Sequence, residues 1–298
     1  MNQPMNIALV TGGYSGESVI SYKSATTIYN HLDKSKFKVF VIDITNEGWF
    51  YSNNGTHESV VDKNDFSITV SGTKILFDCV FIGMHGTPGE DGRLQGYFDV
   101  LGLPYTSCSA ATSAITFNKR YTVAVAAFAG IHVAKSVHLF KHQPVDAATI
   151  DLQLPVFVKP NNGGSSIGMS KVSKKEHLAE AIEKAFNEDD QVLVEEMITG
   201  REFTIGVYKH KAEIIAMPMT EVKADADMEF FDFVAKYQGK STEITPAEAS
   251  EEIFRKISET AKKVYAVFNC SGVIRIDFIY NEERNEPFML EINTVPGQ

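Results

Sequence analysis

The sequence has few cysteines, few basic residues and no long apolar run. Its three cysteines, Cys79, Cys108 and Cys270, are odd in number and lie far apart along the chain. They provide neither a disulfide framework nor the spacing of a metal site, and this sparse use is typical of a reducing compartment. Residues 1–11 also lack the basic start and the longer apolar segment of a signal peptide. We therefore expect a cytoplasmic protein.

The lack of apolar runs and of positive charge excludes two kinds of partner. No segment reaches the roughly 20 consecutive apolar residues that a membrane-spanning helix needs, so we expect no membrane partner. The formal net charge of -10 argues against nucleic acid, because proteins that bind it carry basic patches for the phosphate backbone. A nucleotide is still compatible, since a few lysines and a metal ion can meet its charge. With 298 residues, 44% of them hydrophobic, the chain can form two or three globular domains.

Strands that alternate with helical stretches mark the first third of the chain. An apolar run at 6–10 leads into the glycine-rich segment 11–17 and then into a helical pattern. Further apolar runs lie at 37–42 and 79–84. This alternation predicts an α/β domain with an open parallel sheet, whose ligands bind at the carboxyl ends of the strands.

Two polar residues follow these strand ends, Glu17 and His85. Glu17 begins the first helix, where it either compensates the helix dipole or binds a substrate ammonium group. His85 is either a substrate contact or a partly buried histidine that hydrogen-bonds to backbone. The residues alone leave both alternatives open.

In the middle of the chain, the apolar strand 156–159 ends at Lys159 and is followed by a Gly/Ser-rich connection at 161–168. Consecutive glycines let backbone N–H groups approach a phosphate, the serine hydroxyls add donors, and a lysine is the expected charge partner. The alternative is a flexible hairpin tip with a solvated lysine.

Further along, residues 195–202 have the form of an edge that clamps a nucleotide. The charged stretch 222–245 is too long for a simple turn and is a candidate functional loop.

The last thirty residues contain two runs in which apolar and polar residues alternate, as in a half-buried hairpin. Period 2 places Arg275 and Asp277 on one face of the first strand, and Glu291 and Asn293 on one face of the second. A turn between the runs would set Asp277 opposite Glu291. Oxygen ligands of this kind suit Mg²⁺ or Mn²⁺. An ordinary surface hairpin is the alternative. Before this hairpin, a capping box at 245–248 predicts the start of a long helix.

Taken in order, these motifs resemble those of the D-alanine–D-alanine ligases, a family of the ATP-grasp superfamily. The motifs are GGYSGE at 12–17, HGTPGEDG at 85–92, NK at 118–119, VKP at 158–160 with GSS at 164–166, GRE at 200–202, AKY at 235–237, RID at 275–277 and EINTVPG at 291–297. The resemblance implies an N-terminal Rossmann-like domain at 1–107 and a two-lobed α+β ATP-grasp module. The central lobe would span 108–191 and the C-terminal lobe 192–298, and the protein would be a homodimer.

The resemblance also implies an activity and its residues. The enzyme would join two D-alanine molecules into D-alanyl-D-alanine for peptidoglycan synthesis, using ATP and an acyl-phosphate intermediate. The implied nucleotide contacts are Lys119 and Lys159 for the phosphates, Glu195, Glu196 and Ile198 for the adenine, and Glu202 for the ribose. Ser165, Ser166 and Lys236 are further implied nucleotide contacts. Two Mg²⁺ (or Mn²⁺) ions would bind Asp277, Glu291 and Asn293. The implied substrate-binding and catalytic residues are Glu17, His85, Ser165, Tyr237, Arg275 and Gly297, with 222–245 as a lid.

The sequence departs from the family pattern at two points. Gly163 stands where many members carry a glutamate. The family pattern continues past Gln298 with a segment that contributes to the second D-alanine site, so the expectation from sequence is a shortened or impaired form. Lys236 with Tyr237 favours D-alanine as second substrate. The alternatives are a ligase that uses D-lactate or D-serine, and a catalytically silent nucleotide-binding homologue.

Overall fold

The structure is a computed structural model that describes residues 3–164, 167–224 and 241–297. The chain divides into two compact units. The first contains Met1–Ala114, Cys270–Ile274 and Asn293–Gln298, and the second contains Ile115–Asn269 and Arg275–Ile292. The finer division into three domains at 107/108 and 191/192 stays a prediction.

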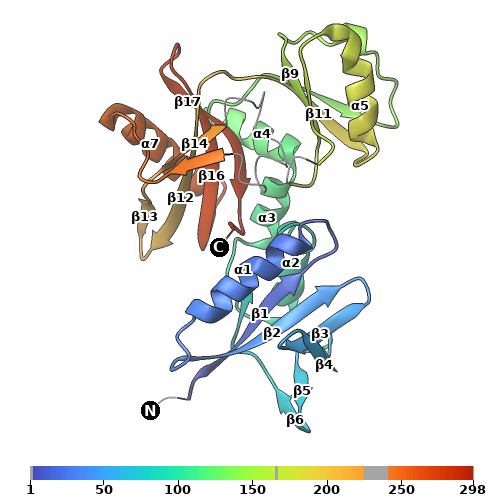
Figure 1. Cartoon of the computed structure of the whole chain (residues 1–298), viewed down its shortest axis with the longest axis vertical. Helices are drawn as coiled ribbons and strands as arrows, with labels where there is room; N and C mark the ends of the chain where they lie inside the picture. The colour runs from blue at the N-terminus through green and yellow to red at the C-terminus, as the bar shows by residue number, and fades with distance from the viewer. Residues whose placement is uncertain (1–2, 165–166, 225–240, 298) are drawn as a thin grey trace. The chain divides into compact units, whose positions relative to one another are not determined.

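The first unit is built on a five-stranded sheet with the order β4-β3-β2-β1-β7 (Figure 1). The central strand β1 (Met5–Gly12) pairs in parallel with β2 (Phe37–Thr45) and with β7 (Cys79–Ile82). This confirms the predicted parallel sheet. The antiparallel edge of this sheet, formed by β3 (Gly48–Asn53) and β4 (Thr56–Val60), was not predicted from the sequence.

Helices cover both faces of this sheet, because successive strand residues point to opposite sides. On one face, α1 (Ser18–His31) buries Ala25 and Ile28 against Leu9. The opposite face packs with α2 (Arg93–Leu101) into a larger core that includes Val10. The same unit holds a small hairpin of β5 (Ile68–Val70) and β6 (Thr73–Ile75), and the helix α3 (Ala110–Phe117) begins within it.

Two of the three cysteines of the first unit lie together although the sequence separates them widely. Cys108 and Cys270 are buried free thiols, and a hydrogen bond with Cys108 together with burial raises the pKa of Cys270. The Ser271 N–H donates to the Cys108 sulfur at 3.4 Å, and the Cys108 thiol donates to the Ser271 carbonyl at 3.3 Å. The sequence does not predict this contact, because 162 positions separate the two cysteines.

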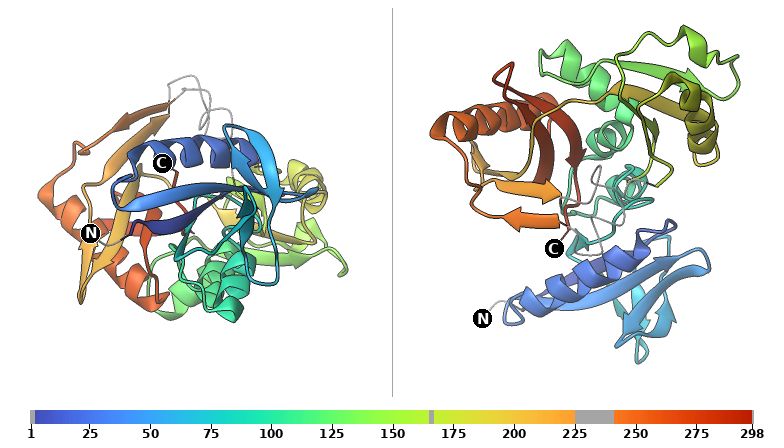
Figure 2. Two further views of the ribbon diagram at one scale, coloured as in Figure 1. Left: turned by 90° about the horizontal axis from the view of Figure 1, so that it is seen from below. Right: turned by 45° about the horizontal axis from the view of Figure 1, so that its top comes forward.

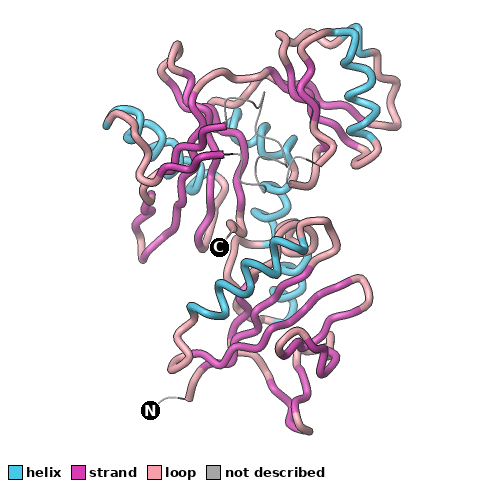
Figure 3. The backbone as a smooth tube through the Cα atoms, viewed as in Figure 1, coloured by secondary structure: helices cyan, strands magenta, loops and turns pink. Residues whose placement is uncertain are grey.

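The second unit begins with α4 (Lys119–Phe128) and an antiparallel sheet in the order β10-β9-β11-β8. The strands are β8 (Ser136–Phe140), β9 (Val156–Pro160), β10 (Ser170–Val172) and β11 (Gln191–Glu196), with short 3-10 turns η1 (Ala147–Thr149) and η2 (Lys175–His177) between them. One face packs against α5 (Leu178–Phe186), burying Val156, Val158, Val192 and Val194. Figure 3 shows α5 as a single helix along these strands.

A second sheet in this unit runs in the order β15-β14-β12-β16-β17, with β13 paired to β12. Its strands are β12 (Arg201–His210), β13 (Glu213–Ala216), β14 (Thr220–Ala224), β15 (Ser241–Ile244), β16 (Val273–Asn281) and β17 (Glu286–Asn293). The predicted terminal hairpin is confirmed, and Arg284 lies in its turn. The helix α7 (Glu251–Val267) contacts β12 and β13 (Figure 2).

The predicted start of α7 was wrong. The capping box at 245–248 stays outside the helix, which begins at Glu251 with Ser250 as its N-cap. The Ser250 hydroxyl accepts from the Ile253 N–H at 3.3 Å. The earlier segment is held elsewhere, because Thr245 hydrogen-bonds to Thr220 and the Ala247 N–H donates to the Met219 carbonyl. Among the described residues, no helix is long and apolar enough to cross a membrane.

Candidate functional site

In the second unit, the start of α4 is hydrogen-bonded to the glycine-rich connection after β9. The Lys119 N–H donates to the Asn161 carbonyl at 3.0 Å, and the Lys119 ammonium donates to the Gly163 carbonyl at 2.6 Å. Asn118 accepts from the Tyr121 N–H at 3.1 Å and caps the helix. The helix N-terminus and the lysine therefore both direct positive potential at this loop, which suits a phosphate.

The loop itself is anchored by residues that the sequence reading did not single out. Asp189 accepts from the Asn162 N–H at 2.7 Å and from the Asn162 side-chain amide at 2.8 Å. The Asn118 amide also donates to Asn162 Oδ1 at 3.1 Å, which ties the loop to α4. Asn161, fully buried, accepts from the Arg120 N–H through its side chain at 2.8 Å. A doubled asparagine beside the glycines was the available signal, but its partners lie on distant strands and helices.

Lys159 and Glu195 lie together on the face of the β10-β9-β11-β8 sheet that does not pack against α5. In the β9–β11 pairing, Lys159 is opposite Leu193 and Glu195 is opposite Phe157. Residues directly opposite share a face, so both charged residues point away from Val158 and Val194. They form an ion pair, with side chains 18% and 11% exposed. Two residues that the sequence assigned to different parts of a nucleotide are thus direct neighbours.

The segment after β11 offers backbone rather than side-chain groups. The Glu196 carboxylate accepts from the Gln153 N–H at 2.8 Å and lies 3.9 Å from the Lys135 ammonium. The Met197 N–H donates to the Pro155 carbonyl at 3.0 Å. Within the described part of the chain, the Ile198 N–H has no backbone acceptor. A purine edge could therefore bind the backbone here, while the Glu196 side chain is already engaged.

Asp277 is held by two donors within the second unit. Arg275 donates to both carboxylate oxygens, at 2.9 Å and 3.0 Å, and the Thr204 hydroxyl donates to Oδ1 at 2.7 Å. These contacts confirm that Arg275 and Asp277 share a face of β16. Asp277 is only 8% exposed, so the arginine compensates a buried charge. Thr204, on the neighbouring strand β12, was missed because 73 residues separate it from Asp277.

The donor chemistry in the middle of β16 and at the end of β17 fits a hard divalent cation. Glu291 and Asn293 are two residues apart on β17 and both are partly exposed, so they present oxygen atoms on one face of that strand. The strand is the neighbour of β16, which carries Asp277. Among the described residues, no three His, Cys, Asp or Glu side chains gather as a metal site. The donor set here has two carboxylates and one amide. Its register stays a prediction.

In the first unit, Glu17 and the loop that carries His85 lie against each other. Glu17 is the N-cap of α1, and a Cβ placed on Gly86 would lie 2.5 Å from its carboxylate. His85 is buried, its ring hydrogen-bonds to Ser24 at 2.9 Å, and its N–H donates to the Ser21 hydroxyl at 2.9 Å. The structure thus brings together the two residues that the sequence reading singled out in this region.

The segment of Gly297 also belongs to this unit. Glu90 accepts from the Gly86 N–H at 2.7 Å through one oxygen and from the Val295 N–H at 3.3 Å through the other. The loop after β7 and the chain after β17 are therefore joined by one carboxylate. Glu90 was missed as an individual residue, although it stands inside the HGTPGEDG motif. Glu202, at the start of β12, pairs in register with Val222.

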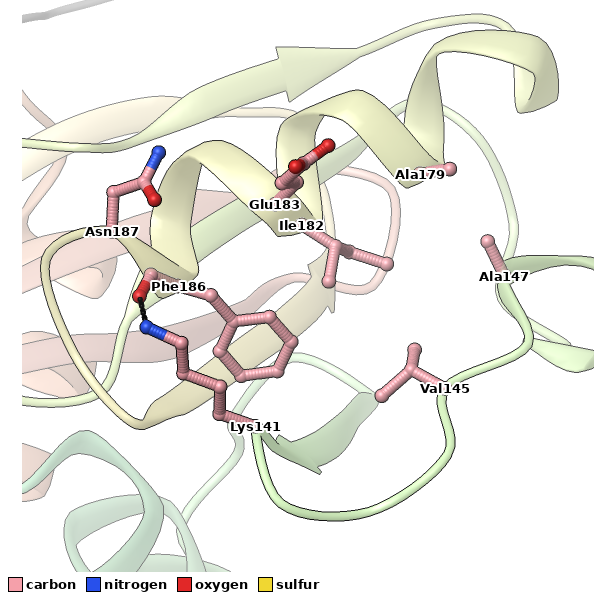
Figure 4. Close-up of a pocket in the computed structure, with 8 residues that line it drawn as sticks. All are labelled: Lys141, Val145, Ala147, Ala179, Ile182, Glu183, Phe186 and Asn187. Atoms are coloured by element: carbon pink, nitrogen blue, oxygen red, sulfur yellow. Dashed lines mark hydrogen bonds between the residues drawn. The ribbon is translucent and has the colours of Figure 1, made fainter.

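Four site residues proposed from sequence lie outside the described residues: Ser165, Ser166, Lys236 and Tyr237. A separate shallow pocket of about 320 Å³ lies beside α5 (Figure 4). It is lined by Ile182 and Phe186, and Lys141 donates to the Phe186 carbonyl at its edge at 2.8 Å. This pocket is on the α5 side of the sheet, away from Lys159 and Glu195, so it is not part of the candidate site.

Comparisons with known proteins cover almost the whole chain. The family model for the D-ala D-ala ligase N-terminus matches residues 6–108, and the model for the D-ala D-ala ligase C-terminus matches residues 117–298. The D-alanine–D-alanine ligase of Flavobacterium johnsoniae is 48% identical over 294 residues, covering 98% of this chain and 90% of that protein.

Solved structures agree with this match. The VanG D-Ala:D-Ser ligase from Enterococcus faecalis aligns with a TM-score of 0.85 at 31% identity, covering 99% of this chain and 91% of that one. A D-alanine–D-alanine ligase from Bacillus anthracis complexed with ATP aligns with a TM-score of 0.76 at 26% identity, covering 98% and 87%. The chain therefore belongs to the D-alanine–D-alanine ligase family of the ATP-grasp superfamily.

Proposed function

We propose that this protein uses ATP to join two D-alanine molecules into D-alanyl-D-alanine, for peptidoglycan precursor synthesis. The observation that carries the proposal is the identity of 48% to the Flavobacterium johnsoniae ligase over 98% of the chain. Lys119 at the glycine-rich loop and Lys159 just before this loop support it, because a nucleotide triphosphate needs localised positive charge.

Nucleotide binding falls to the second unit in this proposal. Lys119 and Lys159 bind the phosphates, with the glycine loop donating backbone N–H groups. The backbone at Glu196 and Ile198 binds the adenine together with Glu195, and Glu202 accepts from the ribose hydroxyls. Lys159 pairs with Glu195 before ATP binds and with a phosphate oxygen afterwards. The charge of the lysine is therefore compensated in both states. Ser165, Ser166 and Lys236 complete the nucleotide contacts.

Asp277, Glu291 and Asn293 would hold two Mg²⁺ ions, which supply charge neutralisation to the ATP phosphates when bound. The chain's own contribution is to hold the first of these ligands. Asp277 keeps its orientation through Thr204 and Arg275, so a metal ligand would be preorganised.

The reaction proceeds in two balanced steps. A carboxylate oxygen of the first D-alanine attacks the γ-phosphorus of ATP, and the bond to the ADP oxygen breaks. The amine of the second D-alanine then attacks the carbonyl of this acyl phosphate, loses a proton, and inorganic phosphate leaves. Glu17 binds the ammonium of the first D-alanine, with His85 beside it. Arg275 and the Gly297 N–H stabilise the tetrahedral oxyanion. Ser165 and Tyr237 contribute from the loops, and the 222–245 lid excludes water.

We further propose a cytoplasmic location and a homodimer formed by the N-terminal domain. Light scattering of the purified protein checks the dimer. A molar mass of one 33.0 kDa chain at working concentration contradicts it.

A coupled assay of ADP release tests the activity. ADP release should require both D-alanine and Mg²⁺, and mass spectrometry should find the dipeptide. ADP release that is unchanged when D-alanine is omitted contradicts the proposal.

A second candidate acceptor is D-serine, because the VanG D-Ala:D-Ser ligase is 31% identical to this chain, against 27% for the D-alanyl-alanine synthetase A from Vibrio cholerae. Competition between D-alanine and D-serine, read by product mass, separates the two. We expect the D-alanine product to dominate, because the F. johnsoniae relative is more similar in sequence.

A further inference from the structure

The segment that carries Glu17 is tied to the core through one aromatic pair. Tyr14, in the middle of this segment, is 39% exposed, and its hydroxyl accepts a hydrogen bond from the Trp49 indole N–H at 3.0 Å. Trp49 is the chain's single tryptophan, and it is only 9% exposed. The one polar side-chain atom of buried Trp49 thus donates to Tyr14, which lies three positions before Glu17, the carboxylate proposed to bind the substrate.

Trp49 is a rigid partner. It lies in β3 opposite Ile44 of β2, and its ring packs edge-on against Tyr97 at 5.4 Å and Phe66 at 6.1 Å. The Lys63 ammonium lies 4.7 Å from the centre of its ring. With its ring held by these contacts, the indole N–H has a fixed direction. A hydrogen bond to it therefore fixes whatever residue accepts it.

The segment 12–17 needs such an anchor, because three of its six residues are glycines. Gly12 and Gly13 adopt positive φ values of 88° and 117°, and Tyr14 is the only large side chain among the six residues. Glycine loses more conformational freedom on ordering than any other residue. The Glu17 N–H donates to the Ser15 hydroxyl within the segment at 3.3 Å, and the tyrosine adds a side-chain contact to the buried core.

Tyr14 also joins the two loops of the candidate substrate site. Its N–H donates to the Thr87 carbonyl at 2.9 Å, two residues after His85. The Gly13 N–H donates to the carbonyl of Ile44, the residue opposite Trp49, at 2.8 Å. The loop of Glu17 is therefore fastened at Tyr14 both to the loop of His85 and to the β2–β3 hairpin.

We propose that Tyr14 and Trp49 are positioning residues for Glu17, and that their hydrogen bond preorganises the site that binds the ammonium group of the first D-alanine. The proposal rests on the proposed function. It assigns Tyr14 no contact with substrate. Its effect passes through the loop, so it concerns D-alanine binding and leaves ATP binding unchanged.

Steady-state kinetics of Tyr14→Phe tests the proposal, because the variant keeps the ring and removes only the hydroxyl. The KM for the first D-alanine should rise roughly 2- to 10-fold, the range of one neutral hydrogen bond. The KM for ATP should stay within about twofold, since the ATP contacts keep their partners. Trp49→Phe should give the same split, and the double variant should be no worse than either single one. Tyr29→Phe, an exposed tyrosine on α1, is the matched control with wild-type constants.

Trp49 fluorescence supplies a second measurement that does not require turnover. D-alanine titrated into the wild type should change the tryptophan emission with saturation, and Tyr14→Phe should shift that curve to higher D-alanine concentration. If Trp49→Phe folds poorly, the titration of Tyr14→Phe still tests whether the hydrogen bond affects D-alanine binding. A wild-type D-alanine KM and an unshifted titration in Tyr14→Phe overturn the proposal. If the wild type itself releases no ADP in response to D-alanine, the proposed function fails instead.

Discussion

At the scale of single residues, two charged side chains of the candidate site already have protein partners in the absence of a ligand. Lys159 pairs with Glu195, and Asp277 is held by Arg275 and Thr204. A partly buried lone charge is costly, and each partner removes part of that cost. The sequence predicted Asp277 and Arg275 by period 2, since neighbours on one strand face are only two positions apart. It could not predict Thr204, which reaches Asp277 from another strand.

Changing Thr204→Val should weaken metal binding. The variant keeps the shape of the side chain but removes the donor to Asp277 Oδ1. The Mg²⁺ concentration for half-maximal ADP release should rise roughly 10-fold or more, as when outer contacts of metal ligands are lost. Thr204→Ser, which retains the hydroxyl, should restore most of the response. An unaltered Mg²⁺ dependence in Thr204→Val would show that the hydroxyl does not orient Asp277.

The Arg201–Glu221 pair should make stability depend on pH. The Arg201 guanidinium donates to Glu221 at 2.8 Å and holds the pKa of that buried carboxyl below its usual 4.5. Its contribution is therefore fully present above pH 4.5 and is lost as the pH falls through the lowered pKa of the folded state. Glu221→Gln should lower the free energy of unfolding by roughly 1–3 kcal/mol at neutral pH.

Denaturant titrations of wild type and Glu221→Gln across this acid range measure the effect. The difference between the two proteins should shrink as the pH falls. A difference in unfolding free energy that stays constant at every pH would mean that the Arg201–Glu221 ion pair is not its cause.

At the scale of elements, apolar runs were enough to place β1, β2, β7 and β9, and the alternation of apolar and polar residues placed the β16–β17 hairpin. The starts of helices were harder to predict from the sequence. The box at 245–248 has the right residues for a cap, but Thr245 and Ala247 have partners around β14 that the local sequence does not reveal. Ser250 is the N-cap of α7, because Thr245 and Ala247 form tertiary hydrogen bonds instead.

Ser250→Ala should therefore destabilise α7. The Ser250 hydroxyl satisfies the Ile253 N–H, so its removal should cost about 1 kcal/mol of unfolding free energy. Ser250→Gly, which glycine's backbone preference partly compensates at an N-cap, should cost only a few tenths. Urea unfolding of the three proteins gives the comparison. Equal losses for alanine and glycine would argue against capping by the hydroxyl.

At the scale of the whole molecule, the proposed chemistry draws on residues that the chain carries in separate compact units. Glu17, His85 and Gly297 belong to the first unit, and the nucleotide-binding candidates belong to the second. The family and its activity could be predicted from short motifs in a fixed order. The hydrogen bonds that hold those motifs could not, because contacts such as Glu90 with Val295 join residues 205 positions apart. Chain separation of that size leaves no local pattern.

The most direct test of the central claim follows an oxygen atom. D-alanine labelled with ¹⁸O in its carboxylate is supplied with ATP and Mg²⁺, and the released phosphate is weighed by mass spectrometry. If the first D-alanine is activated as an acyl phosphate, its carboxylate oxygen leaves on phosphorus. The account therefore predicts one ¹⁸O in each phosphate for each dipeptide formed. Unlabelled phosphate released alongside the dipeptide would contradict it, because the oxygen lost from the first D-alanine would then have left by another route.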